Sequence, residues 1–430
     1  MRILRNPLIA TLVGLRGNQR ACVYTEPLWG LSVNLVLPYL SVYMVALGLR
    51  DIQIGLVTSF GMMGQVITGL LGGVITDKLG RRRTTLFLDA TAWSIPCLIW
   101  LIASYVAPSM AFWVFLGASL VNSLQVITMN SWNCLMVEDA DREQIPHIFS
   151  LIMVGANLSA LFAPISAFLV ARFSLVFALR ILLVNAAIVM TVKVLWVYFW
   201  SHETAVGLRR QKETAGVSIW RLVSEYKGVL GIMLRSRATL FALAIAALYS
   251  AVFTVNQYFW PIAINLRLLV PEAMLPLFPM ARSLLAILFY FAVIHKVSGT
   301  TRFRLPLLAG FGAYLVGQVL VAALPTGTGE TAGWETYVGL GVCVLFDSFG
   351  MGMLAMLAEA IMALAIDPHE RSRIMAVQRV VVIAATVPFG WIAGALSEAN
   401  RSWPFVLTSG LIAIGIAVTL LRYRDKPPAV

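Results

Sequence analysis

Five ionisable residues of this sequence lie inside apolar stretches, where a charge needs a specific role. They are Glu26, Arg282, Asp347, Glu359 and Arg379. If these stretches cross a membrane, each charge near a helix centre costs at least ~2.5–3.5 kcal/mol on insertion scales. Such acids can form ion pairs or take up protons, because burial favours the neutral acid and a nearby arginine favours the carboxylate.

Arg282 and Asp347 stand out because each lies near the middle of its stretch, far from either boundary. We expect them to form a mutual ion pair or to face a common cavity. The sharper hypothesis is that Asp347 or Glu359 takes up a proton, with Arg282 and Arg379 as the neighbouring cations. Glu26 is the corresponding acid in the first half of the chain. A purely structural pairing is the alternative for each.

Two further charges lie nearer to the ends of their stretches. Lys193 is expected to extend its ammonium group to the membrane surface. Asp89 is expected to pair with arginines of the preceding loop. We therefore expect both residues to stabilise the fold and to have no part in transport.

The elements that must position these residues follow from the composition. Of the 430 residues 60% are hydrophobic and 12% are charged, whereas soluble domains carry about 25% charged residues. This excludes a soluble enzyme, a secreted disulfide scaffold and a disordered regulator. Apolar runs of this length predict twelve membrane-spanning helices. They fall near 24–47, 53–75, 85–105, 111–134, 147–170, 177–199, 238–262, 273–294, 305–323, 336–364, 374–396 and 403–421.

The charge balance is basic, with 32 Lys and Arg against 20 Asp and Glu. Most of the basic residues fall in loops on the side of the amino terminus. The positive-inside rule then places both termini and the segment 200–237 in the cytoplasm. Nucleic acid is not needed to explain the charge. The four cysteines have no metal-ligand spacing, and no cofactor, metal or disulfide is expected.

The chain carries a weak internal repeat on either side of segment 200–237. Residues 73–83 match residues 292–302 at one constant offset, through Val74, Ile75, Gly80 and Arg83. The predicted domains are therefore a six-helix bundle at 1–199, a cytoplasmic linker at 200–237 and a second six-helix bundle at 238–430. Paired halves of this kind are common in secondary transporters.

The stretch from Gly73 to Arg83 resembles the loop signature of the major facilitator superfamily, and it lies between the second and third predicted helices, as in that family. The resemblance implies an all-α membrane fold of two pseudo-symmetric six-helix bundles that work by alternating access. It also implies that the signature gates the cytoplasmic side by holding the two bundles together in one state. The predicted gating residues are Gly73, Asp77, Gly80, Arg81, Arg82, Arg83 and Glu138. The second copy has Lys296 in place of the acid.

The resemblance further implies which helices line a central cavity. Their amide and phenol side chains suit a neutral, hydroxylated ligand such as a sugar. The alternative is that these amides hold helices together. The candidate cavity residues are Asn34, Tyr39, Gln65, Asn122, Gln125, Asn157, Tyr249, Asn256, Gln257 and Gln378.

We expect a monomeric, multi-pass protein of the plasma (inner) membrane that is not an enzyme. It would import a small polar solute, a sugar or glycoside, together with protons. The lipid bilayer is its other partner. One alternative is efflux of an amphiphilic compound by proton antiport, which the absence of an arginine from 111–134 disfavours. A second is a membrane sensor or scaffold that no longer transports.

Overall fold

The computed structural model describes residues 7–141, 143–224, 228, 231, 233, 235–289, 303–329, 331–365 and 371–423. These residues contain twelve helical spans that are long and apolar enough to cross a membrane, and none of them forms a strand. The predicted all-α membrane fold is therefore confirmed. The predicted second copy of the loop signature lies outside the described residues.

The first six spans include three that change helical geometry part-way. Their bounds are α2 (Gly17–Ala46), α3 (Asp51–Leu79), α4 with α5 (Arg81–Asp89 and Ile95–Ile102), α6 with α7 (Pro108–Asn122 and Gln125–Val137), α8 with α9 (Ile145–Ser159 and Ala163–Arg172) and α10 (Leu175–Trp200). A π-helical turn at Ala90–Ser94 joins α4 to α5. A 3₁₀ turn at Ala160–Phe162 precedes Pro164, whose ring cannot follow a regular helical turn.

The last six spans begin after the linker. Their bounds are α14 (Arg237–Leu266), α15 (Leu277–Phe289), α17 (Arg304–Ala323), α18 (Trp334–Ala365), α19 (Arg371–Ala399) and α20 (Trp403–Arg422). Among the elements that the structure describes, the shorter α-helices outside the spans are α1 (Pro7–Gly14), α11 (Ala205–Glu213) and α12 (Ile219–Ser224).

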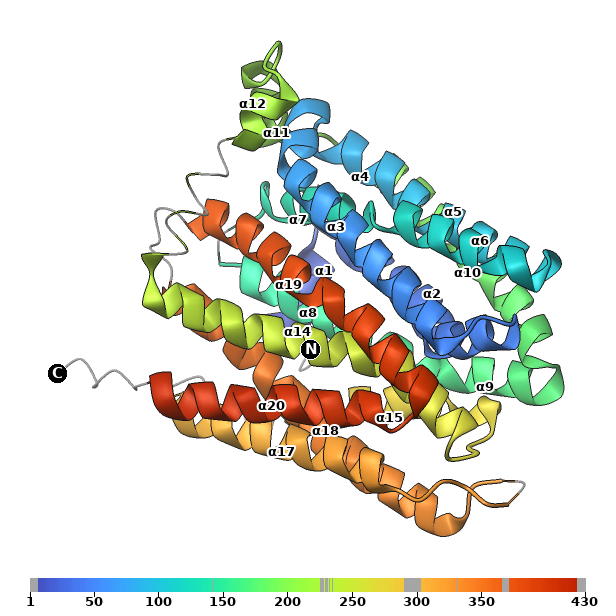
Figure 1. Cartoon of the computed structure of the whole chain (residues 1–430). Coiled ribbons are helices and arrows are strands. Elements are labelled where there is room, and N and C mark those ends of the chain that lie inside the picture. The colour runs from blue at the N-terminus through green and yellow to red at the C-terminus, as the bar shows by residue number, and fades with distance from the viewer. Residues whose placement is uncertain are drawn as a thin grey trace.

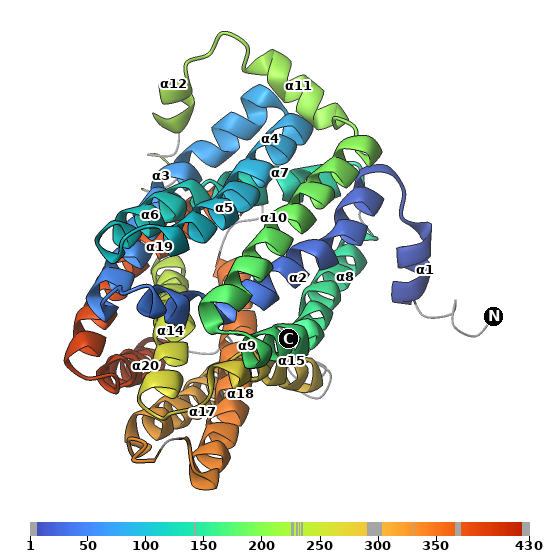
Figure 2. The same cartoon turned by 90° about the vertical axis from the view of Figure 1, so that its right-hand side faces the viewer.

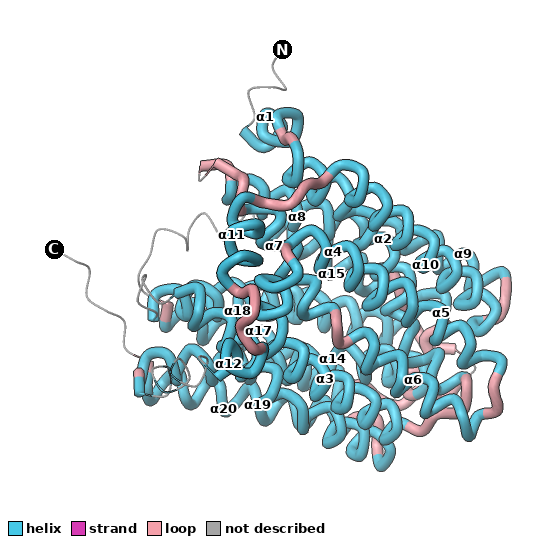
Figure 3. Tube along the Cα trace, turned by 90° about the horizontal axis from the view of Figure 1, so that it is seen from above, coloured by secondary structure: helices cyan, strands magenta, loops and turns pink. Residues whose placement is uncertain are grey.

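The two sets of six helices lie against each other, and α3 and α19 run side by side between them (Figures 1 and 2). Helices α11 and α12 pack near the end of α3. We call this the linker end, and the end where α2 gives way to α3 the opposite end. The two ends lie at opposite ends of the long helices. Figure 3 shows these helices from above.

Glycines bring α3 and α19 into backbone contact near the opposite end. A Cβ atom added at Gly55 would lie 2.5 Å from the carbonyl oxygen of Gly390 and 2.9 Å from Cα of Gly394. Small residues allow this approach between membrane helices. Nearer to the linker end, Gly69 of α3 also faces α19, at the side chain of Val380.

Ser59 adds a polar contact one turn further along α3. Its hydroxyl donates to the carbonyl oxygen of Val387 at 2.7 Å and accepts from the N–H of Trp391 at 2.8 Å. In a regular helix these two backbone groups of α19 would bond to each other. The side chain of one half therefore bridges a backbone donor and acceptor of the other half.

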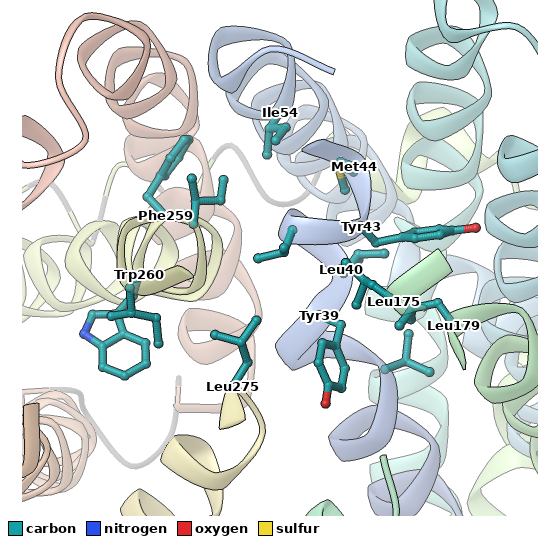
Figure 4. Packing of buried hydrophobic residues seen from close by; sticks show 14 of the residues in the cluster. Tyr39, Leu40, Tyr43, Met44, Ile54, Leu175, Leu179, Phe259, Trp260 and Leu275 are labelled. Carbon is teal, nitrogen blue, oxygen red and sulfur yellow. The ribbon is translucent and has the colours of Figure 1, made fainter. Parts of the chain in front are cut away.

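A buried apolar cluster closes the opposite end. It joins Tyr39 and Tyr43 of α2 to Phe259 and Trp260 of α14 and to Leu275, which precedes α15 (Figure 4). All five side chains are at most 2% exposed. We call these five residues the seal. Because it contains residues of both halves, the halves must move apart there before this end can open.

Candidate functional site

The predicted ion pair between α15 and α18 is present. Nη2 of Arg282 lies 3.2 Å from Oδ2 of Asp347, whose side chain is 1% exposed. The pair lies at the interior of the second half, away from both ends of its helices. A carboxylate buried to this degree needs a cation or hydrogen-bond donors to stay charged. Its role in proton coupling stays a prediction.

Asp347 is also part of a buried hydrogen-bond network. Nε2 of Gln318 in α17 donates to Oδ1 of Asp347 at 3.1 Å. The amides of Gln318 and Asn256 bond to each other at 3.0 and 3.2 Å. Thr408 of α20 donates to Gln318 at 2.8 Å, and the amide of Asn256 donates to the Tyr314 hydroxyl at 3.3 Å. Hydrogen bonds thus connect the ion pair to residues of α14, α17 and α20.

Arg282 connects this network to the seal. Its guanidinium carbon lies 4.1 Å from the centre of the Trp260 ring, a cation–π distance. Within the part of the chain that the structure describes, Nε of Arg282 and Nε1 of Trp260 are buried donors without an acceptor. A buried donor without an acceptor is destabilising by about 1–3 kcal/mol. Arg282 is therefore in contact with a titratable acid on one side and with the seal on the other.

Sequence reasoning did not identify Trp260, Gln318, Tyr314 or Thr408. A signal existed for Trp260, because it follows Asn256 by one helical turn and therefore shares its face. Gln318 is the one amide side chain of α17. None of the candidate cavity residues lies on that helix, because the resemblance does not place it at the cavity.

The second predicted acid–base pair is not formed. Glu359 and Arg379 are both exposed, and among the described residues no ion pair joins them. They are close enough to interact electrostatically. The guanidinium of Arg379 instead contacts Sδ of Met129 in α7, across the boundary between the halves.

The first half contains its own buried charges. Nζ of Lys193 lies 2.8 Å from Oδ2 of Asp89, and both side chains are at most 5% exposed. The expectation that Lys193 reaches the surface was therefore wrong, as was the expected pairing of Asp89 with loop arginines. The reason is that α10 packs against the third span and brings the two charges together at the same depth. Glu26 is 8% exposed and interacts electrostatically with both.

The predicted gating residues form a charge cluster at the linker end. Arg81 donates to Asp77 at 2.8 Å and to Glu138 at 3.0 Å, so Glu138 is the partner that the sequence predicted. Gly80 has φ of 89°, a conformation that favours glycine. Arg82 and Arg83 do not join this acidic cluster through their side chains in the described residues. Among the described residues, Asp77 makes its contacts within the first half, to Arg81, and with the linker, to Thr214.

The linker supplies a residue that the sequence did not reveal. The carboxylate of Glu203 accepts from the backbone N–H groups of Arg81 at 2.9 Å and Arg82 at 3.0 Å, and so caps the start of α4. Thr204 donates to Glu138, and Gln211 of α11 donates to the carbonyl of Leu79 at 2.7 Å. The beginning of the linker is therefore docked on the signature loop.

The candidate cavity residues differ in the contacts that they make. Four of them bond to neighbouring groups of their own half, as the helix-packing alternative predicts: Asn34 to Gly30, Asn122 to Ala92, Gln125 to Asn122 and Asn157 to Met153. Asn256 belongs to the buried network and Tyr39 to the seal. By contrast, the side-chain amides of Gln65, Gln257 and Gln378 make no hydrogen bond with the described residues. With respect to the described residues, these three amides therefore have unused donors and acceptors. Tyr249 stacks against Phe253.

Comparison with known proteins gives the same fold. The family model described as Major Facilitator Superfamily matches residues 28–346. A solved structure of a variant of the nucleoside transporter NupG is 14% identical, with a TM-score of 0.72, and the match covers 95% of this chain and 100% of that one. The xylose transporter XylE from E. coli, in a partially occluded inward-open conformation, is 12% identical, with a TM-score of 0.68 and coverage of 98% and 99%.

A third similar structure is a variant of the peptide transporter POT in complex with sulfate. It is 15% identical, with a TM-score of 0.67, and the match covers 94% of this chain and 93% of that one. Among curated proteins, none matches this sequence.

Proposed function

This chain belongs to the major facilitator superfamily of membrane transporters, which are not enzymes, and we propose that it moves a sugar or glycoside together with protons. The observation that carries the proposal is the position of Arg282. It is held between the buried acid Asp347 and the seal residue Trp260. A proton bound at Asp347 would therefore change a contact of the seal.

The coupling step follows from simple electrostatics. While Asp347 is ionised, the ion pair fixes the guanidinium of Arg282 above the Trp260 ring. Protonation of the acid removes the attraction and frees the guanidinium. Trp260 then loses its cation–π partner, and the seal that joins the halves becomes easier to open. Proton uptake and opening of the opposite end are thereby linked.

The unpaired donors suggest the chemical class of the solute. Arg282 and Trp260 offer buried N–H groups that need acceptor oxygens, and Trp260 offers an aromatic face. The amide of Gln257, on the same helix as Trp260, adds a donor and an acceptor. Sugar hydroxyls accept and donate hydrogen bonds, and their C–H faces pack on aromatic rings. We therefore assign the solute site to the region around Arg282, Trp260 and Gln257, next to the seal.

The moving units and the orientation are part of the proposal. The halves are 1–199 and 238–430, and the segment 200–237 connects them. The basic loops support an orientation in a plasma (inner) membrane in which the linker end and both termini face the cytoplasm. Because one chain supplies both halves of the transporter, we propose a monomer as the working unit.

The experiment is uptake into proteoliposomes with and without an inward proton gradient. The probes are labelled monosaccharides, glycosides, nucleosides and dipeptides. We expect gradient-dependent accumulation of a saccharide, abolished in Asp347→Asn and unchanged in Asp141→Asn, an exposed acid that serves as the control. Full gradient-driven uptake by Asp347→Asn would exclude this coupling site. Uptake of a nucleoside or dipeptide alone would exclude the solute class, and no uptake of any probe would favour the sensor.

A further inference from the structure

A groove runs along the outer surface of the first half, away from the boundary between the halves. It has a volume of about 620 Å³ and lies where the third span meets α10. Its walls are apolar over most of their length, from Phe87 to Ile95. The π-helical turn places Ala90, Thr91 and Ser94 in the groove. These small side chains leave the hollow between the larger Phe87 and Ile95.

The linker end of the groove carries positive charge. Arg82 and Arg83 lie there, and none of the lining residues is acidic. Arg83 is exposed and has no ion pair or hydrogen bond with the described residues. A cation without an acidic partner beside an apolar groove is suited to bind an amphiphile that has an anionic headgroup and an apolar chain.

The second arginine is fixed in position. Nη2 of Arg82 donates to the carbonyl oxygen of Tyr198 at 2.6 Å, and Nε donates to the Ser201 hydroxyl at 3.3 Å. Its guanidinium carbon lies 5.0 Å from the centre of the Tyr198 ring. The charge of Arg82 is therefore held at the rim before any ligand arrives, which lowers the entropy lost on binding.

Aromatic residues show where the groove lies relative to a bilayer. Trp196 and Trp200 stack at 5.7 Å and are exposed, as is Tyr198 at the rim. Exposed tryptophan and tyrosine side chains gather at the level of lipid headgroups. The arginines are then at headgroup depth, and the apolar length of the groove is at acyl-chain depth.

We propose that this groove binds one anionic phospholipid from the leaflet at the linker end. The phosphate lies at Arg83 and Arg82, and an acyl chain follows Phe87, Ala90 and Ile95. Charge complementarity and the apolar length below the rim favour a lipid over a soluble anion. Because Glu203 binds the backbone N–H of Arg82, the lipid also contacts the segment on which the linker is docked.

The test is native mass spectrometry of protein purified from vesicles of equal parts phosphatidylglycerol and phosphatidylcholine. We expect preferential retention of one phosphatidylglycerol. Arg83→Gln should lower that preference about fivefold, the effect of one arginine near an anionic membrane surface. Arg209→Gln is the matched control, since Arg209 is an exposed arginine of the same end that does not line the groove.

A second variant tests the apolar part. Ala90→Phe fills the groove without changing a charge and should reduce retention of either lipid, while the folded fraction on gel filtration stays unchanged. Equal retention of the two lipids by the wild-type protein would overturn the proposal. So would equal losses in Arg83→Gln and Arg209→Gln, or dimers in place of bound lipid.

Discussion

The carboxylate of Asp51 at the start of α3 lies 3.3 Å from Nε of Arg401, which lies in the turn between α19 and α20. Within the described part of the chain, this is the ion pair that joins the two halves. The side chain of Arg401 is 37% exposed, so the pair contributes at most about 1 kcal/mol. Ser397 donates to the same carboxylate at 2.7 Å. These contacts mark the opposite end as closed, but close packing must supply most of its stability.

Gly55→Ala should destabilise that closed end. The added methyl group would lie within 2.5 Å of a backbone oxygen of α19, which cannot move as a flexible side chain can. Overpacking of this kind costs about 1–3 kcal/mol. We expect greater labelling of a cysteine introduced at Tyr43, in a background without the native cysteines. Gly117→Ala, where the methyl group meets open space, is the control and should not change labelling. Equal labelling in the two variants would contradict the packing argument.

Gly317→Ala should disturb the acid of the proposed coupling site without touching its charge. The new Cβ atom would lie 2.2 Å from Oδ1 of Asp347, so that carboxylate must leave Gln318. We expect proton-driven uptake to fall while solute exchange without a gradient is retained. Gly312→Ala lies on the same helix with no atom nearby and should behave as wild type. Unchanged driven uptake in Gly317→Ala would show that the position of this carboxylate is unimportant.

Lys193→Met should strongly destabilise the first half. Removing one partner of a buried ion pair typically costs about 3–5 kcal/mol, and here Asp89 and Glu26 would both lose their nearest cation. The double variant Lys193→Met with Asp89→Leu should recover most of the loss, because no unpaired charge remains at that pair. Thermal unfolding in detergent measures both. If the double variant is less stable than the single one, the pair is stabilising in itself and the argument fails.

Glu203→Gln should loosen the linker. The amide keeps its shape but loses the charge that caps two N–H groups at the start of α4, an interaction worth about 0.5–2 kcal/mol. Trypsin should then cut faster at Arg209 and Arg210 of α11. Glu213→Gln, an exposed acid of α11, gives the comparison. Cleavage at the wild-type rate in Glu203→Gln would mean that α11 is held by other contacts.

The number of spans could be predicted from the sequence because it depends on local composition, whereas the role expected of the signature loop came from its resemblance to the family. The depth of Arg282 and Asp347 led to two expected arrangements, a mutual ion pair or a shared cavity, and the structure shows the ion pair. The partner of Asp89 could not be found this way, because Lys193 is remote in sequence and its orientation depends on how α10 is rotated. Gly55 was missed for the same reason. Glu203 could not be predicted because it lies in a polar segment, where the sequence does not distinguish an acid with a specific contact from other surface charges.

The bridge made by Ser59 has a consequence for how easily the halves can separate. When α3 leaves, the carbonyl of Val387 and the N–H of Trp391 can bond to each other as in any helix. The freed hydroxyl can turn to a carbonyl one turn earlier in α3, as the hydroxyl of Thr58 does to Ile54. No backbone group is then left unsatisfied in the hydrocarbon, where such a group would cost several kcal/mol. The contact can therefore form and break reversibly, because each of its three groups finds a hydrogen bond within its own helix when the halves separate.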